Sequence, residues 1–493
     1  MGDPIRSARI AVLSNKCNSE EDKKLNRKSE EVVVLAKQSN VCGGKDYREN
    51  RSWRGNVRST TETYKDTETK LKRIAWLSSK DADKGFGCLM HLCNETSLDI
   101  CFKELGGNKA VGIDDINKAK YGENLETNLE ELICRMKKMA YKPQPVRQVM
   151  IPKEGAKTMR PLGISSFEDK LVQKMMQKIL ESIYEPIFYK CSYGFRPGRG
   201  CHDAIRDLLN YLYGNHVKIV IDIDLENFFG KIDHKLLEEI LRKKIKDEKF
   251  MRYIKRMFKA GILAEKELIV SDEGVPQGSC CSPVLANIFA HYVIDEWFES
   301  TVKSRCRNNV ELFRYADDAV ICCQTERDAQ RIKLALSKRL ARFKLKLNEK
   351  KTKFISFSKW AYKRGEKQGA FDFLGFNFYW GKSRNGAMIP KVKTSGKRMR
   401  SKLKKVKIWV RENKDRYKLP WIWKKFCIKL EGHIRYYGVS YNHRVEIFVY
   451  KALTILYKWL NRRSQRKSFT WEKFWMFVES HSVPQIKVHH KLF

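Results

Sequence analysis

Aspartates interrupt two otherwise apolar stretches of this chain. Residues 218–225 form a β-rich run that carries Asp222 and Asp224 two residues apart, and therefore on the same face of a strand. Residues 312–323 form a second apolar run, with two adjacent aspartates at the turn of a predicted β-hairpin. Two acids in a turn are common by themselves, because aspartate hydrogen-bonds locally there. Together with the strand, they indicate a shared carboxylate site.

The clustered carboxylates require a compensating charge. A buried acid raises its pKa and neutralises, and neighbouring acids strengthen that tendency. Mg²⁺ prefers hard oxygen ligands, and two ions about 3.5 to 4 Å apart can activate a 3′-hydroxyl and stabilise a leaving pyrophosphate. We therefore expect two Mg²⁺ ions at Asp317, Asp318 and an aspartate of the strand, Asp222 or Asp224. The chemistry that this site implies is in-line phosphoryl transfer.

The charge of the chain indicates a polyanionic partner. Its 99 Lys and Arg residues against 58 Asp and Glu residues give a formal net charge of +41. Nucleic acid is the usual partner of such a chain, because each phosphate contact releases counterions. We find no apolar run of about 18 residues and no signal-peptide pattern, so we expect no membrane contact. The expected location is cytoplasmic, of the bacterial type and nucleoid-associated on DNA, or organellar.

Changes in composition divide the chain into four parts. Residues 1–70 are a polar extension that we expect to be weakly ordered, and a helical pattern starts at Leu71. Residues 71–215 and 216–385 read as a mixed α+β region. Residues 386–493 are helical and basic, with interleaved aromatic residues. The predicted strands lie at 148–151, 218–225, 312–323 and 371–379, and the predicted helices at 125–139, 169–184 and 234–258.

A series of motifs resembles the group II intron reverse transcriptases. Residues 313–318, Phe-Arg-Tyr-Ala-Asp-Asp, are similar to the Y-A-D-D signature of that family. The agreement extends over roughly residues 71–493, in the order of the family. Its further blocks are 141–153 with 160–164, 192–202, 224–229, 274–279 with 282–287, 347–352 and 371–376.

The resemblance implies specific metal ligands. In the family, the strand acid is followed after four and five residues by two aromatic residues, which matches Asp224 with Phe228 and Phe229. Asp222 is then a neighbour on the same face. The implied ligands of the two Mg²⁺ ions are Asp224, Leu225, Asp317 and Asp318. The sequence departs from the family at Gly230 and at Cys280-Cys281, and none of these is a metal ligand.

The resemblance also assigns residues that handle dNTPs. Lys153 and Arg160 would hold the triphosphate, Arg160 by its planar fork. Phe229 would act as a steric gate against the 2′-hydroxyl, and Gln277 with Gly278 would pack beside the nascent base pair. The other nucleotide-binding residue is Phe228.

A lysine near residue 351 is a candidate proton donor. Lys351 would protonate the leaving pyrophosphate, although Lys350 is nearly as good a candidate. A solvated run of charge is the competing reading of both lysines.

The final region resembles the thumb and maturase part of the family. Basic helices with aromatic residues suit structured RNA, which is read by phosphate, 2′-hydroxyl and stacking contacts. The chain reaches Phe493 without the Cys- and His-bearing endonuclease domain of some members, so we expect no nuclease. The candidate RNA-binding residues are Lys402, Lys404, Lys405, Arg462, Arg463, Arg466 and Lys467.

These observations predict a right-hand polymerase with fingers and palm, followed by an α-helical thumb and maturase domain. The resemblance implies an RNA-directed DNA polymerase that binds its own group II intron RNA, assists its splicing and copies it during retrohoming. Its implied substrates are an RNA template with a DNA primer or target DNA, and dNTPs. Two alternatives are a stand-alone reverse transcriptase in defence or template diversification, and a splicing factor without polymerase activity. Whether the chain forms a dimer is open.

Overall fold

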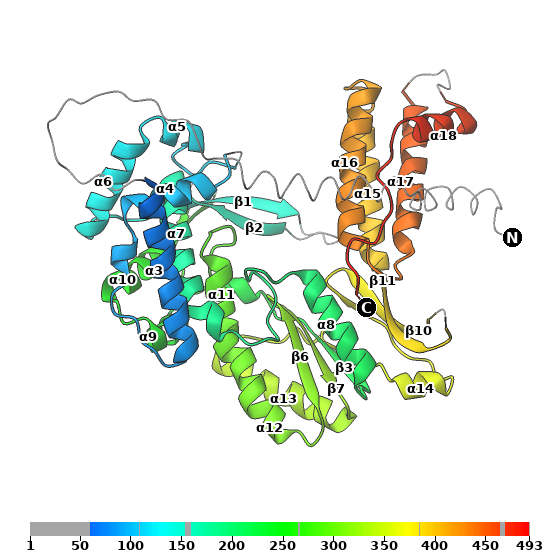
Figure 1. Ribbon diagram of the computed structural model, residues 1–493, viewed down its shortest axis with the longest axis horizontal. Helices are drawn as coiled ribbons and strands as arrows, with labels where there is room; N and C mark the ends of the chain where they lie inside the picture. The colour runs from blue at the N-terminus through cyan, green and yellow to red at the C-terminus, as the bar shows by residue number, and fades with distance from the viewer. Residues whose placement is uncertain are drawn as a thin grey trace, which may run out of the picture. The chain divides into compact units, whose positions relative to one another are not determined.

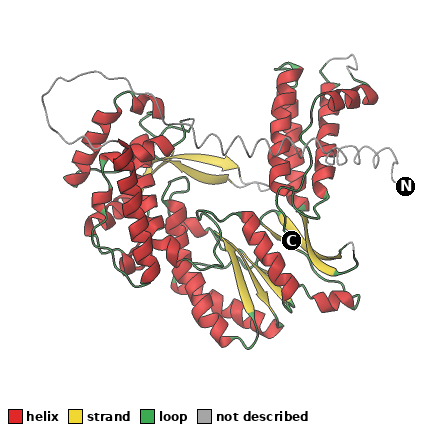
Figure 2. Cartoon of the chain, in the orientation of Figure 1, coloured by secondary structure: helices red, strands yellow, loops and turns green. Residues whose placement is uncertain are grey.

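The computed structural model describes residues 60–107, 109–152, 159–264, 267–383, 385–463 and 469–492. Residues 1–59 of the expected extension lie outside this set. The described residues form two compact units: a larger unit, residues 60–374 and 378–391, and a C-terminal unit, residues 375–377 and 392–492. Helices and three β-sheets build the described chain, which confirms the α+β class (Figure 2). None of the described helices combines the length and hydropathy that crossing a bilayer requires.

Helices at the start of the larger unit pack around α7 (Phe167–Tyr184), which is almost fully buried on its apolar side. The first, α3 (Thr60–Lys80), begins before the Leu71 boundary that we expected. Its polar first half is stabilised by ion pairs one turn apart, such as Asp66–Lys70 at 2.7 Å, which a hydrophobic pattern does not reveal. The other helices here are η1 (Met90–Leu92), α4 (Glu95–Glu104), α5 (Lys118–Gly122), α6 (Leu125–Lys137) and η2 (Glu185–Ile187).

A four-stranded sheet, ordered β2-β1-β4-β5, follows in the larger unit. Strands β1 and β2 form an antiparallel hairpin in which Arg147 pairs with Ile164, and β1 pairs with β4 in parallel. The strand expected at 148–151 is therefore the centre of β1. The bounds are β1 (Val146–Pro152), β2 (Met159–Ile164), β4 (Ile262–Ala264) and β5 (Glu267–Ile269).

A second four-stranded sheet, antiparallel and ordered β6-β7-β3-β8, carries the aspartate segments. The strand expected at 218–225 is β3, and the hairpin expected at 312–323 is β6 with β7 (Figure 1). The bounds are β3 (Ile219–Ile223), β6 (Val310–Tyr315), β7 (Asp318–Cys323) and β8 (Lys353–Ser356).

One face of this sheet belongs to the main hydrophobic core. Ile221, Ile321 and Leu312 lie in register across β3, β7 and β6 and pack with α13 (Glu326–Arg342). The long helical segment before β6 joins the same core. It consists of α11 (Ser282–Ala290), the π-helical turns η4 (His291–Asp295) and η5 (Phe298–Val302), and α12 (Lys303–Arg305).

The opposite face of the sheet packs against α8 (Cys201–Gly214). Phe313, Val320 and Asp222 lie in register on this face, and the ring of Phe313 is 5.8 Å from that of Tyr211 of α8. An acid of β3 therefore shares its face with α8 and not with α13.

The helix expected over 234–258 is divided in two, α9 (His234–Lys244) and α10 (Glu248–Lys259). The Asp247 carboxylate caps α10 by accepting a hydrogen bond from the Phe250 amide at 3.0 Å. The cap is a local polar signal that interrupts an otherwise continuous apolar period. The prediction of one helix over 234–258, which used helical periodicity alone, was therefore wrong about the break between α9 and α10.

A buried ion pair anchors the turn between β6 and β7. Arg314 of β6 is 1% exposed and contacts both carboxylate oxygens of Asp295, at 2.7 and 2.6 Å. The same guanidinium donates to Ser192 Oγ at 2.6 Å, to Asn287 Oδ1 at 3.2 Å and to the Ala316 carbonyl at 3.0 Å. Arg314 thus satisfies its charge internally while holding the residue that precedes the two turn aspartates.

The C-terminal unit is mainly helical, as expected. Thr394 and Asn442 connect its start to its interior, because the Asn442 side chain accepts from the Thr394 amide at 3.0 Å. A three-stranded sheet, ordered β11-β10-β9, runs across the boundary between the units in the chain. The elements are α14 (Lys359–Lys363), β9 (Phe371–Phe373), β10 (Phe376–Lys382), β11 (Met388–Thr394), α15 (Gly396–Asn413), α16 (Leu419–Tyr437), α17 (Arg444–Leu460) and α18 (Trp471–Ser480).

We expect Arg314→Leu to lower the free energy of unfolding by about 3 to 5 kcal/mol, because it leaves the Asp295 carboxylate buried without its partner. Denaturant unfolding of the purified protein measures the change. The Arg314→Leu/Asp295→Leu double variant is the control, and it should be more stable than the single variant because no unpaired charge remains. A single variant as stable as wild type would contradict an anchoring role of the pair.

Candidate active site

Strand register brings the predicted carboxylates to one end of the sheet. In the β3–β7 pair, Ile223 lies opposite Ala319 as the last pair of the ladder, so Asp224 and Asp318 both adjoin this pair at the same end of the sheet. Asp224 and Asp318 then share the α8 side of the sheet with Asp222, because residues two apart in a strand face the same way. The turn residue Asp317 follows Ala316, whose φ of 57° lies in the left-handed region. The acids of both predicted segments therefore meet.

The chain after Asp224 is held by a short β-bridge. The Asp224 carbonyl accepts from the Asn348 amide at 2.8 Å, and the Glu226 amide donates to the Lys346 carbonyl at 3.0 Å. These bonds flank the bridged pair Leu225 and Leu347 without using the main-chain groups of Leu225. The expected ligand Leu225 has a buried side chain, so only its main-chain oxygen could meet a metal.

Two cations oppose the carboxylate charge. Lys351 Nζ lies 2.8 Å from Asp224 Oδ2, so of the two candidate lysines the structure places Lys351 at the acids. Burial raises the pKa of Asp317, and the neighbouring Asp224 charge raises it further, while Arg160 and Lys351 lower it. Arg160 of β2 and Lys351 are therefore both within electrostatic reach of the turn.

Asp222 behaves differently from the other acids. Its pKa is raised to about 6, mainly by burial, with Asp224 and Asp372 adding to the shift and Lys353 opposing it. Asp222 is paired in register with Lys353 of β8. The two strand acids therefore differ in their surroundings: burial raises the pKa of Asp222, whereas Asp224 forms a direct ion pair with Lys351.

The acids fit a divalent cation by charge. Among the described residues, no three His, Cys, Asp or Glu side chains are close enough together to hold a metal. The side chains of Asp224, Asp317 and Asp318 are therefore not gathered around one point. The Lys351 ammonium is instead the cation in contact with Asp224. Because Asp317 is half-buried beside a second acid and its pKa is raised, a cation between them would relieve the repulsion. The donor set consists of oxygen atoms, which Mg²⁺ prefers.

Aromatic residues line the approach to the carboxylates. Asn227, with a left-handed φ of 46°, starts the 3-10 turn η3 (Phe228–Gly230). Phe228 is buried, whereas Phe229 is half-buried and its ring lies 6.4 Å from that of Phe195 in an edge-to-face arrangement. Phe195 is 49% exposed, and its ring is 6.5 Å from that of Tyr315, close to the Asp317–Asp318 turn. Phe195 was not among our candidates, although it lies in the 192–202 block.

Gln277 and Gly278 are joined to the strand that carries Arg160. The Gln277 carbonyl accepts from the Gly163 amide of β2 at 2.6 Å. Gly278 has a φ of +119°, and a Cβ atom there would lie 2.2 Å from the Gly163 carbonyl oxygen, so only glycine permits this approach. A cavity of about 250 Å³ lies alongside, lined in part by Gln148, Gly163 and Gln277.

The predicted RNA-binding residues lie in the C-terminal unit, apart in the chain from the carboxylates. Lys402, Lys404 and Lys405 are exposed on α15. Arg462 and Arg463 are exposed just after α17, and the Arg462 guanidinium lies 5.1 Å from the centre of the Trp459 ring. The candidates Arg466 and Lys467, and Lys153 of the larger unit, lie outside the described residues.

The chain is similar to a known protein family and to several known proteins. The family described as "Reverse transcriptase (RNA-dependent DNA polymerase)" matches residues 151–378. The group II intron-encoded protein LtrA of Lactococcus lactis is 36% identical over 228 residues, which are 46% of this chain and 38% of LtrA. Protein YkfC of Escherichia coli is 32% identical over 315 residues, which are 57% of this chain and 79% of YkfC.

Relatives also occur in eukaryotic introns. The "uncharacterized 91 kDa protein in cob intron" of Schizosaccharomyces pombe is 40% identical over 173 residues, which are 35% of this chain and 21% of that protein. The matched stretch thus spans well under half of LtrA and of this yeast protein. With YkfC matched over most of its length and the reverse transcriptase family covering the carboxylate sheet, the chain belongs to the reverse transcriptase family.

Proposed function

We propose that this chain is an RNA-directed DNA polymerase whose active site is built on Asp224, Asp317 and Asp318. The observation that carries the proposal is the β3–β7 register, which sets the strand acid opposite the Asp-Asp turn at one end of the sheet. In this assignment residues 71–215 contain the fingers, residues 216–385 the palm and residues 386–493 the thumb and maturase domain. The two yeast COX1 intron proteins among its relatives, 30% and 32% identical over shorter stretches, support an intron setting.

The residues of the chain divide the work of nucleotidyl transfer. Two Mg²⁺ ions held by Asp224, Asp317, Asp318 and the Leu225 carbonyl would activate the primer 3′-hydroxyl and neutralise the phosphates. Arg160 orients the triphosphate, because its planar fork matches phosphate oxygens. Lys351 is held at the acids by Asp224, from where its ammonium can give a proton to the leaving pyrophosphate.

The nucleotide is selected by shape. The Phe229 ring, braced edge-to-face by Phe195, fills the space in which a ribose 2′-hydroxyl would lie. Gln277 and Gly278 present their backbone beside the new base pair, and their contact with Gly163 keeps that surface in line with β2. A dNTP is therefore the substrate, paired with an RNA template.

We further propose that the C-terminal unit binds the group II intron RNA, assists its splicing and positions it for retrohoming. The exposed lysines of α15 and the arginines after α17 support this role, since a distributed basic surface neutralises the phosphates of folded RNA. A splicing factor without polymerase activity is less consistent with the assembled acids. A stand-alone reverse transcriptase in defence or template diversification remains the alternative that the splicing experiment below distinguishes.

Asp317→Ala should reduce Mg²⁺-dependent cDNA synthesis by about a thousandfold, because a metal site supplies several kcal/mol and about 1.4 kcal/mol is a factor of ten in rate. Primer extension on an RNA template measures it, with circular dichroism to verify folding. Asp83→Ala, which removes an exposed acid far along the chain from the sheet, is the matched control and should be fully active. A folded Asp317→Ala protein that extends primers at the wild-type rate would refute the site.

Phe229→Ala should lower the preference for dNTP over rNTP by roughly tenfold or more, because removing the ring opens space for the 2′-hydroxyl. Single-nucleotide incorporation with each substrate measures the ratio of kcat/KM values. Phe354→Ala is the control: that ring is 39% exposed on β8 and lies 5.7 Å from the Lys333 ammonium. Unchanged discrimination in an active Phe229→Ala enzyme would assign this ring to packing.

Asp224→Ala should stop cDNA synthesis but leave splicing of the cognate intron intact, because splicing requires the basic surface and not the carboxylates. Charge reversal of Lys402, Lys404 and Lys405 should instead weaken intron binding and reduce its salt slope by roughly one unit per lost phosphate contact. Splicing and primer extension are measured on the same preparation of each variant.

The matched control for charge reversal changes three exposed lysines of the larger unit, Lys249, Lys259 and Lys367. It should preserve intron binding. Two outcomes would replace the maturase proposal with the stand-alone polymerase. In one, the α15 lysine variant splices normally at limiting protein. In the other, the wild type binds an unrelated structured RNA as tightly as it binds the flanking intron.

A further inference from the structure

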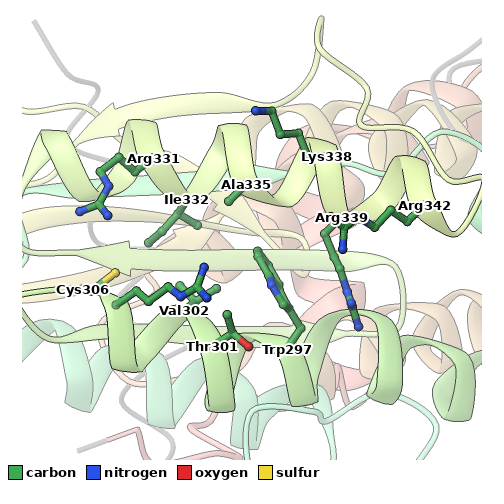
Figure 3. Close-up of a pocket in the computed structure, with 11 residues that line it drawn as sticks. Trp297, Thr301, Val302, Cys306, Arg331, Ile332, Ala335, Lys338, Arg339 and Arg342 are labelled. Atoms are coloured by element: carbon green, nitrogen blue, oxygen red, sulfur yellow. The ribbon is translucent and has the colours of Figure 1, made fainter.

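A basic groove lies behind the carboxylate sheet, within the larger unit. It has a volume of about 560 Å³ and runs between α13 and the helical segment 297–306 (Figure 3). Five of its lining residues are cationic and none is acidic. The lining cations are Arg305, Arg331, Lys338, Arg339 and Arg342. A groove with this lining selects for anions.

The groove is separate from the proposed active site. The helix α13 packs with Ile221 and Ile321 on one face of the sheet, whereas Asp222 and Asp224 project to the opposite face. Arg305 lies five residues before Val310, which pairs with Cys323 at the end of the hairpin away from its turn. Tyr315, at the end of β6 that adjoins the aspartates, is five residues further along the strand and roughly 17 Å from Val310. The groove therefore lies on the face of the sheet that α13 covers, opposite to the face of Asp222 and Asp224.

The lining cations differ in the hydrogen bonds and ion pairs that they already make within the chain. Arg339 is used structurally, because it donates to the carbonyls of Val293 and Tyr292 at 3.2 and 3.1 Å. Arg331 has a long contact of 3.9 Å with Asp328. In the part of the chain that the structure describes, no ion pair involves Arg305, Lys338 or Arg342, and all three are exposed. These charges are available to a ligand.

The spacing of the cations fits a linear polyanion. Arg331, Lys338 and Arg342 extend over eleven residues of α13, which corresponds to roughly 16 Å of helix. A single phosphate or a mononucleotide would engage only part of this row. A chain of phosphates can follow its whole length, and the groove volume is in the range of ligand sites.

The apolar lining of the groove suits the bases of a nucleic acid. Trp297, Val302, Ile332 and Ala335 supply an apolar surface between the charged walls. Trp297 is half-buried at the edge of the core and still lines the groove. Aromatic rings within a basic groove bind single-stranded nucleic acid by stacking on its bases while the cations hold its backbone. An acidic polypeptide would satisfy the cations but not the ring.

From these observations we propose that the groove between α13 and residues 297–306 is a second nucleic-acid site, which holds a single-stranded polynucleotide with its bases on Trp297 and its phosphates along Arg305, Lys338 and Arg342. The site goes beyond the proposed polymerase and intron-binding functions and does not depend on either. It gives the chain a means to hold a strand that is not in the active site.

Photo-crosslinking tests the location on the wild-type protein. The protein is first saturated with a short template–primer duplex, and a 4-thiouridine oligoribonucleotide or a 4-thiothymidine oligodeoxynucleotide is then added and irradiated. Peptides that cover 297–306 and 326–342 should carry the crosslink. A crosslink to both oligonucleotides establishes a general single-strand site, and a crosslink to the RNA alone restricts the ligand to RNA. Crosslinks confined to other peptides would overturn the proposal.

Substitution tests the chemistry. Arg305→Gln/Arg342→Gln should lower the salt slope of single-strand binding by about 1.4 units, since each contact to a single strand contributes about 0.7. Lys249→Gln/Arg252→Gln removes two exposed cations of α10 as a matched control and should leave the slope unchanged. Trp297→Leu should weaken binding at least about fivefold, whereas Trp297→Phe should retain most of the affinity.

Primer extension on short substrates should be normal in all of these groove variants, which separates failure of this site from failure of the polymerase. Poly-glutamate is the competitor that probes anion selectivity alone. If poly-glutamate displaces the oligonucleotide as well as unlabelled RNA does, or if the double arginine variant binds with the wild-type salt slope, the groove is not a nucleic-acid site.

Discussion

The buried pair of Arg314 and Asp295 is the interaction on which the carboxylate end of the sheet depends. One guanidinium joins the edge strand β6, the helical segment after Ser282 and the chain at Ser192, and it also holds the Ala316 carbonyl. A buried pair of this kind contributes little net stability compared with apolar packing, but it tolerates only one arrangement of its partners. The pair therefore acts on geometry. The turn that carries Asp317 and Asp318 cannot shift without breaking the contacts of Arg314 and leaving a buried charge unpaired.

The parts of the site that sequence patterns predicted are those encoded by local periodicity. The strand at 218–225 and the hairpin at 312–323 were recognisable because apolar residues alternate or run continuously and because acids are out of place there. Register then follows from the pairing of the two apolar runs, so the meeting of their acids was predictable too. The choice of Asp224 over Asp222 required the family motif, and it stays a prediction; the structure shows only that the two acids differ in their surroundings.

What the sequence did not disclose depends on contacts between distant residues. Asp295 lies in an apolar helical segment with no signal that its partner is a strand arginine, and Phe195 acts through a ring contact with Phe229 across more than thirty positions. Likewise, the local sequence does not show whether Lys351 or Lys350 contacts Asp224. The path of the loop that is hydrogen-bonded at Asn348 determines which of the two lysines does so. The early start of α3 was missed for another reason: polar residues with ion pairs one turn apart form a helix without an apolar period.

The contact between Gly163 and the Gln277–Gly278 segment has a consequence for motion. A hydrogen bond of 2.6 Å and a glycine-only approach fasten the base of the β1–β2 hairpin, the end away from its turn, to a loop more than a hundred residues later. The base of the β1–β2 hairpin and this loop therefore move together, because shifting either one alone would break the hydrogen bond between them. In the proposed function, joint movement of this kind would shift Arg160 and the Gln277–Gly278 surface together, so that the triphosphate and the new base pair would be contacted in a single conformational step.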